Sequence, residues 1–128
     1  MNQLVEKRKF RRFEITGGEA RYKKIGLHAF LKDFSNPYPL LNISIGGLSI
    51  LYEEEFGQGE EAMIQLVAPN EAPLNLRSRM IWQGPLVLST DLVIAFEFLP
   101  FDDNKGCNPP GTLNVLRRLY ARYAKYGK

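Results

Sequence analysis

Two short segments of the sequence carry the side chains best suited to binding a ligand, and the first of them suits phosphate. It is the basic run Arg8-Lys9-Phe10-Arg11-Arg12. An arginine side chain can hold phosphate oxygens with its planar fork, pair with the O6 and N7 edge of guanine, and stack its face on a base. A guanine nucleotide would use all three modes. The alternative interpretation is a solvated tail that attracts anions without specificity.

The second segment is Asn42-Ile43-Ser44-Ile45-Gly46-Gly47, which joins two apolar stretches. Asn and Ser side chains can order a turn by bonding to nearby backbone, and two glycines permit a positive φ and the close approach of a ligand. A tight turn between two strands would account for the same composition. Neither segment therefore identifies a function by itself.

The elements that must position these segments are mostly β-strands, because short β-branched and aromatic runs alternate with Gly, Pro, Asn and acidic residues. The predicted strands are Phe13–Tyr22, Leu40–Ile43, Gly47–Tyr52, Ala62–Ala68, Leu74–Gln83 and Leu92–Leu99. Turns are expected over Glu54–Gly59, at Pro69-Asn70-Glu71 and at Gln83-Gly84-Pro85. Many short strands at this spacing favour a small antiparallel barrel or sandwich, since closing the sheet removes exposed edges.

The last predicted strand indicates where the core lies, because its residues alternate between two faces. The face predicted to be buried carries Leu92, Ile94, Phe96 and Phe98. The opposite face carries Val93, Ala95, Glu97 and Leu99. Further residues predicted to pack with the first face are Ile64, Leu66, Met80 and Trp82.

The C-terminal stretch predicts a helix over about residues 112–126, with one apolar stripe and a basic opposite face. The stripe consists of Leu113, Leu116, Leu119, Tyr120 and Tyr123, and the basic face of Arg118, Arg122 and Lys125. The helix can begin at Asn108-Pro109 or at Thr112, because both Asn and Thr cap free backbone N–H groups. Residues 26–39 show no clear pattern and are expected to form a long connection that can include a helical turn.

Length and composition favour one globular domain that is soluble and cytoplasmic. The chain has 128 residues, 45% hydrophobic and 24% charged. No apolar run reaches the roughly 18 to 20 residues that span a bilayer, and no signal region is present. The single cysteine, Cys107, and the single histidine, His28, leave no set for an internal disulfide or a zinc site. No catalytic set or phosphate-binding loop is recognisable, so an enzyme is not expected.

Charge is distributed unevenly around a net charge of +3. Both ends of the chain are basic, whereas the stretch over residues 53–61 contains five glutamates. This acidic stretch and the outer helix face are the candidate surfaces for a protein partner, although a solvated surface explains such runs equally well.

The two ligand-binding segments together, in this order and about thirty residues apart on an all-β pattern, resemble the PilZ domain family. That family carries an RxxxR motif, here Arg8 to Arg12, followed by a D/N-x-S-x-x-G motif, here Asn42, Ser44 and Gly47. The resemblance spans about residues 6 to 126, although Ala95 stands where a glycine is usual. It implies a six-stranded antiparallel, split-barrel-like PilZ fold with a C-terminal α-helix.

The resemblance also implies a ligand, cyclic di-GMP, and a role for each motif residue. Arg8 and Arg12 would hold phosphates and guanine edges or faces. Asn42 and Ser44 would bond to the guanine and phosphate of a ligand on the barrel surface. No catalytic residue, metal site or further cofactor is implied.

The other residues of the implied site are Gly46, Gly47 and Lys7. The glycines would keep the turn low enough for the ligand to lie across it, and Lys7 holds a position that influences whether one or two ligand molecules bind. The chain is then expected to divide into residues 1–12, a flexible basic segment that folds over the ligand, and residues 13–128, the barrel with its helix.

The expected function is that of a bacterial receptor that changes conformation on binding cyclic di-GMP and signals to a partner protein in trans, in motility, biofilm or exopolysaccharide control. Neither membrane insertion nor binding of a nucleic-acid polymer is expected. Two alternatives stay open: a PilZ-like barrel that only contacts proteins, and a small basic barrel that binds nucleic acid through its tail and helix. The partner, the ligand stoichiometry and the oligomeric state cannot be read from the sequence.

Overall fold

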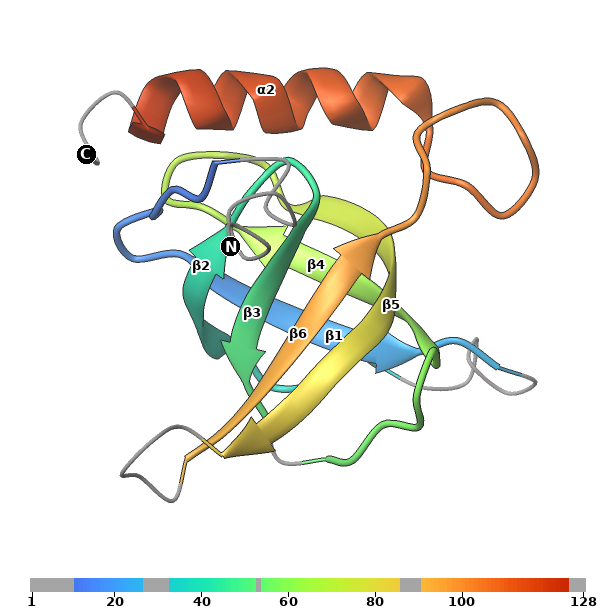
Figure 1. The fold of residues 1–128 in the computed structure, drawn as a ribbon. Coiled ribbons are helices and arrows are strands. Elements are labelled where there is room, and N and C mark those ends of the chain that lie inside the picture. Colours follow the sequence, from blue (N-terminus) through green and yellow to red (C-terminus); the bar gives the residue numbers. More distant parts are fainter. Residues whose placement is uncertain (1–10, 27–32, 53, 86–90, 125–128) are drawn as a thin grey trace, which may run out of the picture.

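Six antiparallel strands form a closed barrel in the order β1-β2-β3-β6-β5-β4, and a helix, α2, lies across one end of it (Figure 1). The structure, a computed structural model, describes residues 11–26, 33–52, 54–85 and 91–124. The elements are β1 (Glu19–Lys24), β2 (Tyr38–Ile43), β3 (Gly47–Leu51), β4 (Glu61–Val67), β5 (Leu74–Pro85), β6 (Leu92–Phe98) and α2 (Pro110–Ala124). This architecture confirms the predicted six-stranded barrel with a C-terminal helix.

The first strand is shorter than predicted, because a turn interrupts it. Gly17 has a φ of 77°, a backbone conformation that favours glycine, and the amide of Gly18 donates to the carbonyl of Ile15 at 2.8 Å. Among the described residues before this turn, only Phe13 pairs, through an isolated bridge, and the regular strand begins at Glu19. The prediction of one strand over residues 13–22 was therefore wrong in its first half.

The second and fifth strands are longer than predicted. β2 begins at Tyr38 instead of Leu40, because Tyr38 and Pro39 pair with β1. β5 continues through Gln83-Gly84-Pro85, where a turn was expected, because these residues pair with β6 as far as Leu92. The proline is tolerated there because β4 pairs with β5 only as far as Arg79, so the end of β5 has one strand neighbour.

A β-bulge in β5 reverses the predicted orientation of Trp82. Met80 pairs with Phe96 and Trp82 pairs with the preceding residue of β6, Ala95, so Ile81 is the extra residue. As a result Met80 is buried, whereas 51% of Trp82 is exposed. Strict alternation had placed Trp82 in the core, and the bulge turns it to the surface.

The core fills the barrel and continues beneath α2. Its largest fully buried side chains include Ile43, Ile50, Ile64, Leu66, Leu76, Ile94, Phe96 and Leu116. Ile94, Phe96 and Phe98 of β6 are buried as predicted, but Leu92 is exposed at the end of the barrel. Val93 and Leu99, predicted to face outward, are buried as well.

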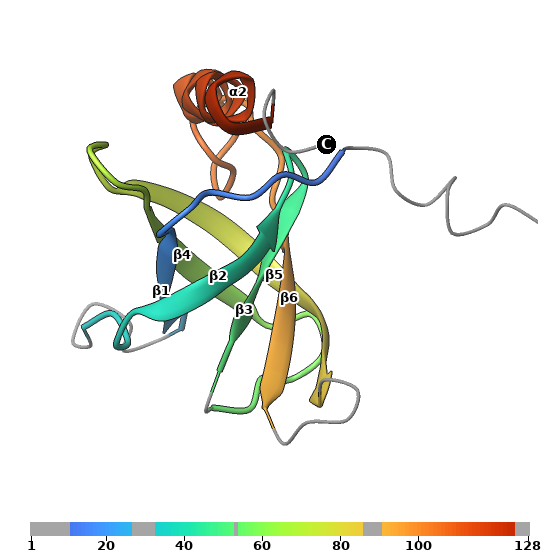
Figure 2. The same ribbon diagram turned by 90° about the vertical axis from the view of Figure 1, so that its left-hand side faces the viewer.

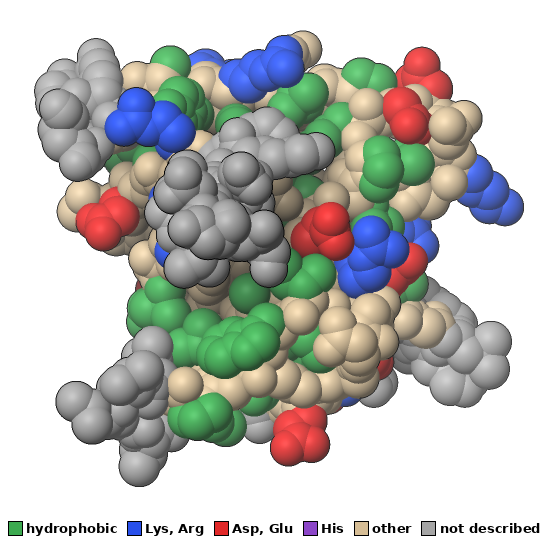
Figure 3. All heavy atoms as spheres, viewed as in Figure 1, with side chains coloured by type: hydrophobic (Ala, Val, Ile, Leu, Met, Phe, Trp, Pro, Cys, Tyr) green, Lys and Arg blue, Asp and Glu red, His purple; other side chains and the backbone are tan. Residues whose placement is uncertain are grey.

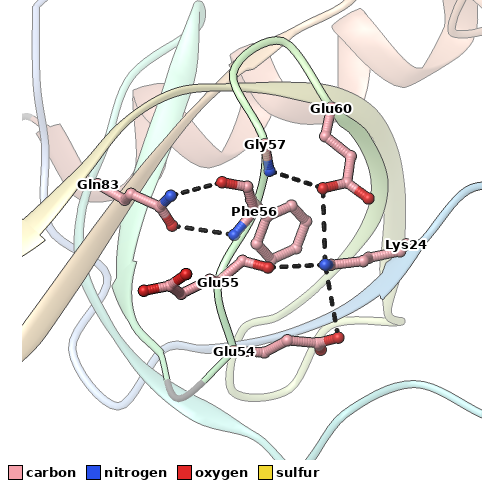
Figure 4. A network of polar contacts seen from close by, with 7 residues as sticks. All are labelled: Lys24, Glu54, Glu55, Phe56, Gly57, Glu60 and Gln83. Atoms are coloured by element: carbon pink, nitrogen blue, oxygen red, sulfur yellow. Dashed lines mark hydrogen bonds and ion pairs between the residues drawn. The ribbon is translucent and has the colours of Figure 1, made fainter.

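The loop between β3 and β4 closes the barrel on the side away from α2. Phe56 inserts into the core, and Gln83 bonds to both its N–H and its carbonyl (Figure 4). Lys24 donates to the carbonyl of Glu55 at 2.7 Å and forms ion pairs with Glu54 and Glu60 at 3.6 and 3.5 Å (Figure 4). Two glutamates of the acidic stretch therefore neutralise Lys24 of β1, and a third, Glu61, pairs with Arg77 of β5 at 3.4 Å.

Helix α2 packs its apolar stripe onto the barrel as predicted. Leu116 and Leu119 are buried, and Tyr120 and Tyr123 pack against the core. The helix begins at Pro110, between the two starts that the sequence allowed, Asn108-Pro109 and Thr112. Proline holds its first position, where the missing N–H costs little. Residues 125–128 lie outside the described part of the chain.

Asn108 does not cap this helix, although the sequence allowed that role. Its buried carboxamide accepts from the Arg77 N–H at 2.6 Å and donates to the carbonyls of Arg77 and Leu99 at 2.9 and 3.0 Å. These bonds tie the connection between β6 and α2 to the edge of β5.

Candidate functional site

The candidate site is built where the N-terminal segment meets the end of β2. Phe13 and Ile43 form an antiparallel bridge, in which the Phe13 N–H donates to the Ile43 carbonyl at 2.7 Å and the Ile43 N–H donates back at 3.2 Å. Both side chains are buried, so the bridge joins the two segments at the barrel wall. Figure 2 shows the N-terminal segment crossing beside β2 and beneath α2.

The register of this bridge determines which side chains of the two motifs become neighbours. Only Phe13 and Ile43 pair here, but in an antiparallel pair a step forward on one strand matches a step back on the other. From this bridge we infer that Arg12 lies next to Ser44 and Glu14 next to Asn42. Because the side chains of Phe13 and Ile43 point inward, their neighbours along the chain point outward. The second arginine of the first motif therefore lies on the same outer surface as the polar residues of the second.

The turn between β2 and β3 is ordered by its own hydrogen bonds. The Ser44 N–H donates to the Gly47 carbonyl at 2.8 Å, and the Gly46 N–H donates to the Ser44 hydroxyl oxygen at 3.0 Å. The carbonyl of Gly46 accepts from the Phe98 N–H at 2.9 Å, which joins the turn to the end of β6. The second motif thus presents a rigid edge.

Gly47 serves packing within the barrel. A Cβ at this position would lie 2.1 Å from the carbonyl oxygen of Phe96 on β6, a severe overlap. Its φ is outside the left-handed region, so the positive φ considered from the sequence is not used here. The close approach that this glycine permits is that of a neighbouring strand.

A continuous outer row of side chains extends from this turn across the sheet. Asn42 pairs with Ser49, Ser49 with Ala95, and Ala95 with Trp82. The Ser49 hydroxyl donates to the Asn42 side-chain oxygen at 3.3 Å, which confirms that both face the same side. Adjacent strands are about 4.8 Å apart, so the row places a polar end and an exposed indole roughly 14 Å from each other.

The surface between these two ends is low. Ser49 and Ala95 have small side chains. The Trp82 ring lies over Gly84, so close that a Cβ atom added to Gly84 would be 3.0 Å from the ring. Figure 3 shows hydrophobic side chains gathered over the lower part of β3 and β6 on this face. Among the described side chains, none between the two ends of this row would therefore obstruct a planar base that lies against the sheet.

The N-terminal segment also contacts α2. The rings of Phe13 and Tyr120 pack edge to face, with centroids 5.3 Å apart and an interplanar angle of 85°. Glu71, in the turn after β4, accepts from Arg118 at 3.0 Å and from Arg122 at 2.7 Å and so holds the helix to the barrel. A movement of the N-terminal segment would therefore act on α2 through the contact of Phe13 with Tyr120.

The structure brings together five of the seven residues that the sequence proposed. Arg12, Asn42, Ser44, Gly46 and Gly47 meet at the end of β2. Arg12 is exposed, and no hydrogen bond or ion pair engages its guanidinium within the described part of the chain. Lys7 and Arg8 lie outside the described residues, as do the other residues of the segment expected to be flexible, up to Phe10.

Sequence reasoning missed Trp82, Glu14 and Ser49. A bulge signal such as Met80-Ile81-Trp82, three apolar residues in succession, could have shown that alternation fails near Trp82. The placement of Glu14 and Ser49 needed the strand register, which no local pattern contains.

Other chemistry is not suggested by the described residues. Among them, no group of His, Cys, Asp and Glu side chains is arranged to hold a metal ion. Burial raises the pKa of the Cys107 thiol, and the hydrogen bond and charge of Asp102 add to the increase, so this thiol stays protonated at neutral pH. No helix in the described part of the chain is long and apolar enough to cross a membrane.

Comparison with known proteins identifies a family and several solved structures of similar fold. The PilZ domain matches residues 6–108 of the chain. The structure of YcgR from Escherichia coli, solved in complex with c-di-GMP, superimposes with a TM-score of 0.66 at 18% identity, over 90% of this chain and 45% of that one. The structure of the Bacillus subtilis inhibitor of motility, MotI/DgrA, superimposes with a TM-score of 0.60 at 14% sequence identity. The match covers 90% of this chain and 51% of that one. The chain thus spans about half the length of both structures. No curated protein sequence matches it.

Proposed function

We propose that this chain, which belongs to the PilZ domain family, is a receptor for cyclic di-GMP. The observation that carries the proposal is the Phe13–Ile43 bridge, because it brings the residue after Arg12 against the residue before Ser44. The complex of YcgR with c-di-GMP supports the choice of ligand, since that protein shares the fold.

The chemistry of the site suits a dianionic ligand with two flat bases. The exposed guanidinium of Arg12 offers a phosphate oxygen or a guanine edge a bidentate partner. Asn42 and Ser44 add short polar groups at the rigid edge of the turn. At the far end of the row, the half-exposed indole of Trp82 offers an apolar face on which a base can stack, worth about 1–3 kcal/mol per base in nucleic-acid complexes.

Arg8 is assigned the second basic role in this proposal. It precedes Arg12 by four residues, and the ligand's two phosphates call for more than one guanidinium. Lys7 would add a further cation beside it. Binding would draw this segment onto the barrel, so that the ligand and the segment together form a new surface.

The receptor would act in trans on a protein partner. Through the contact of Phe13 with Tyr120, the ligand-bound N-terminal segment can change the position of α2 on the barrel. A change of that kind would alter the surface around the helix, where Arg117 and Arg118 are exposed. Motility, biofilm and exopolysaccharide control are the expected outputs.

Calorimetric titration of the whole chain with cyclic di-GMP tests the proposal and yields affinity and stoichiometry together. Arg12→Ala and Arg8→Ala are each expected to weaken binding by more than about tenfold, because each removes a charge-assisted donor from the phosphates or bases. Arg21→Ala is the matched control: Arg21 is exposed on β1 between two buried residues, away from the proposed site, and its loss is expected to leave the affinity unchanged.

Two outcomes would contradict the proposal. Absence of binding by the unsubstituted chain would favour a PilZ barrel that serves only protein interaction. Tight binding of single-stranded RNA without binding of the dinucleotide would favour the nucleic-acid alternative. The helix aromatics Tyr120 and Tyr123 already argue against RNA stacking on α2, because they pack against the barrel.

A further inference from the structure

Glu14 is a carboxylate at the polar end of a site proposed to bind an anion. It follows Arg12 by two residues, and both are exposed while the intervening Phe13 is buried, so the two side chains lie on the same outer face. Within the described part of the chain, no hydrogen bond or ion pair engages the Glu14 carboxylate. Its exposed carboxylate is therefore placed where a ligand bound at Arg12 could reach it.

The bridge register places Glu14 at the head of the outer row. Phe13 pairs with Ile43, so Glu14 lies next to Asn42, which pairs in turn with Ser49. The Asn42 side-chain oxygen accepts from the Ser49 hydroxyl at 3.3 Å, and the amide hydrogens of Asn42 remain donors that a ligand can use. The polar end of the row thus combines a donor, Asn42, with an acceptor, Glu14.

A carboxylate here repels the phosphates of a bound nucleotide unless the base returns hydrogen bonds to it. Guanine can do so, because its N1–H and its N2 amino group are adjacent donors that match the two oxygens of a carboxylate. Adenine has an unprotonated N1 on the same edge. This nitrogen is a hydrogen-bond acceptor, so its lone pair would repel the carboxylate oxygens. A charged acceptor at this position would therefore select for guanine and against adenine.

We propose that Glu14 reads the N1–H and N2 amino edge of one guanine of the bound dinucleotide and is a specificity-determining residue of the site. This inference rests on the proposed function, because it names a further contact within the same site. Glu14 needs no movement of the barrel to take this role, since the Phe13 bridge already holds it beside Asn42.

The test is calorimetric titration of the whole chain and of Glu14→Gln with three ligands: cyclic di-GMP, cyclic di-IMP, which lacks the N2 amino group, and cyclic di-AMP. In Glu14→Gln we expect the affinity for cyclic di-GMP to fall by about tenfold or more, because a charge-assisted pair of hydrogen bonds is lost. The affinity for cyclic di-IMP should fall less. Binding of cyclic di-AMP should be unchanged or stronger, so the preference for guanine over adenine falls by more than tenfold.

Glu19→Gln is the control, since Glu19 is an exposed carboxylate at the start of β1, and its ligand preferences are expected to equal those of the unsubstituted chain. If Glu14→Gln weakens all three ligands equally, or none of them, the inference is wrong while the proposed function stands. If the unsubstituted chain binds no cyclic dinucleotide, the proposed function and this inference are both overturned. A far-ultraviolet circular dichroism spectrum equal to that of the unsubstituted chain establishes that the exposed substitution leaves the barrel intact.

Discussion

The edge-to-face contact of Phe13 with Tyr120 is expected to couple the N-terminal segment to α2, and its strength can be measured with a double-mutant cycle. Aromatic pairs in this geometry are worth about 0.5–1.5 kcal/mol beyond the burial of their area. Phe13 is buried, with 4% of its surface exposed, so Phe13→Leu loses both the aromatic pair and some packing, in total about 2 kcal/mol.

The cycle consists of Phe13→Leu, Tyr120→Leu and the double variant, each unfolded with urea and followed by circular dichroism. The double variant is expected to lose about 1 kcal/mol less than the sum of the single losses, since the contact can be lost only once. Tyr120→Leu is also expected to weaken cyclic di-GMP binding about fivefold, because about 1 kcal/mol that holds the Phe13 segment against β2 is gone.

A matched cycle pairs Tyr120→Leu with Phe56→Leu, because Phe56 belongs to the loop between β3 and β4, which lies at the end of the barrel away from α2 (Figure 1). These two substitutions should add to within about 0.5 kcal/mol. If the Phe13 and Tyr120 substitutions are equally additive, the proposed route from the ligand site to the helix is refuted. The same conclusion follows if Tyr120→Leu leaves the ligand affinity unchanged.

Three further substitutions test how the site is supported. Asn108→Ala is expected to cost about 3 kcal/mol in urea unfolding, because buried backbone groups lose their partners, whereas Asn104→Ala should cost little; a loss below about 1 kcal/mol would contradict this account. Hydrogen bonds from Arg118 and Arg122 hold the pKa of Glu71 below its ordinary value of 4.5. The stability that the Glu71 ion pairs contribute is therefore complete above pH 4.5, and it is lost as the pH falls through the lowered pKa of the folded state. The stability difference between the unsubstituted chain and Glu71→Gln should therefore shrink on acidification, and a difference that is independent of pH would count against the ion pair. Gly47→Ala should lower the melting temperature by roughly 10 °C or more, because its Cβ would overlap a carbonyl oxygen on β6, whereas Gly26→Ala, with open space around it, should not; equal melting temperatures would argue against that close approach.

The sequence by itself determined the type of structure and the two motifs. Alternating apolar residues predict strands, and the 3.6-residue spacing of Leu116, Leu119 and Tyr120 predicts the helix, because both signals arise from neighbours along the chain. The motif residues Arg12, Asn42 and Ser44 were identified by resemblance to the PilZ domain family. Their roles in binding stay predictions, as does everything proposed for Lys7 and Arg8.

Only the tertiary structure decided which of these residues are neighbours. Strand register depends on pairing between segments far apart in the sequence, and it alone placed Glu14 beside Asn42 and Trp82 in the same outer row. The bulge at Ile81 has the same origin, because one unpaired residue shifts every later side chain to the other face of the sheet. Alternation along the chain cannot report such a shift, and so the sequence placed Trp82 in the core while the folded barrel presents it to solvent.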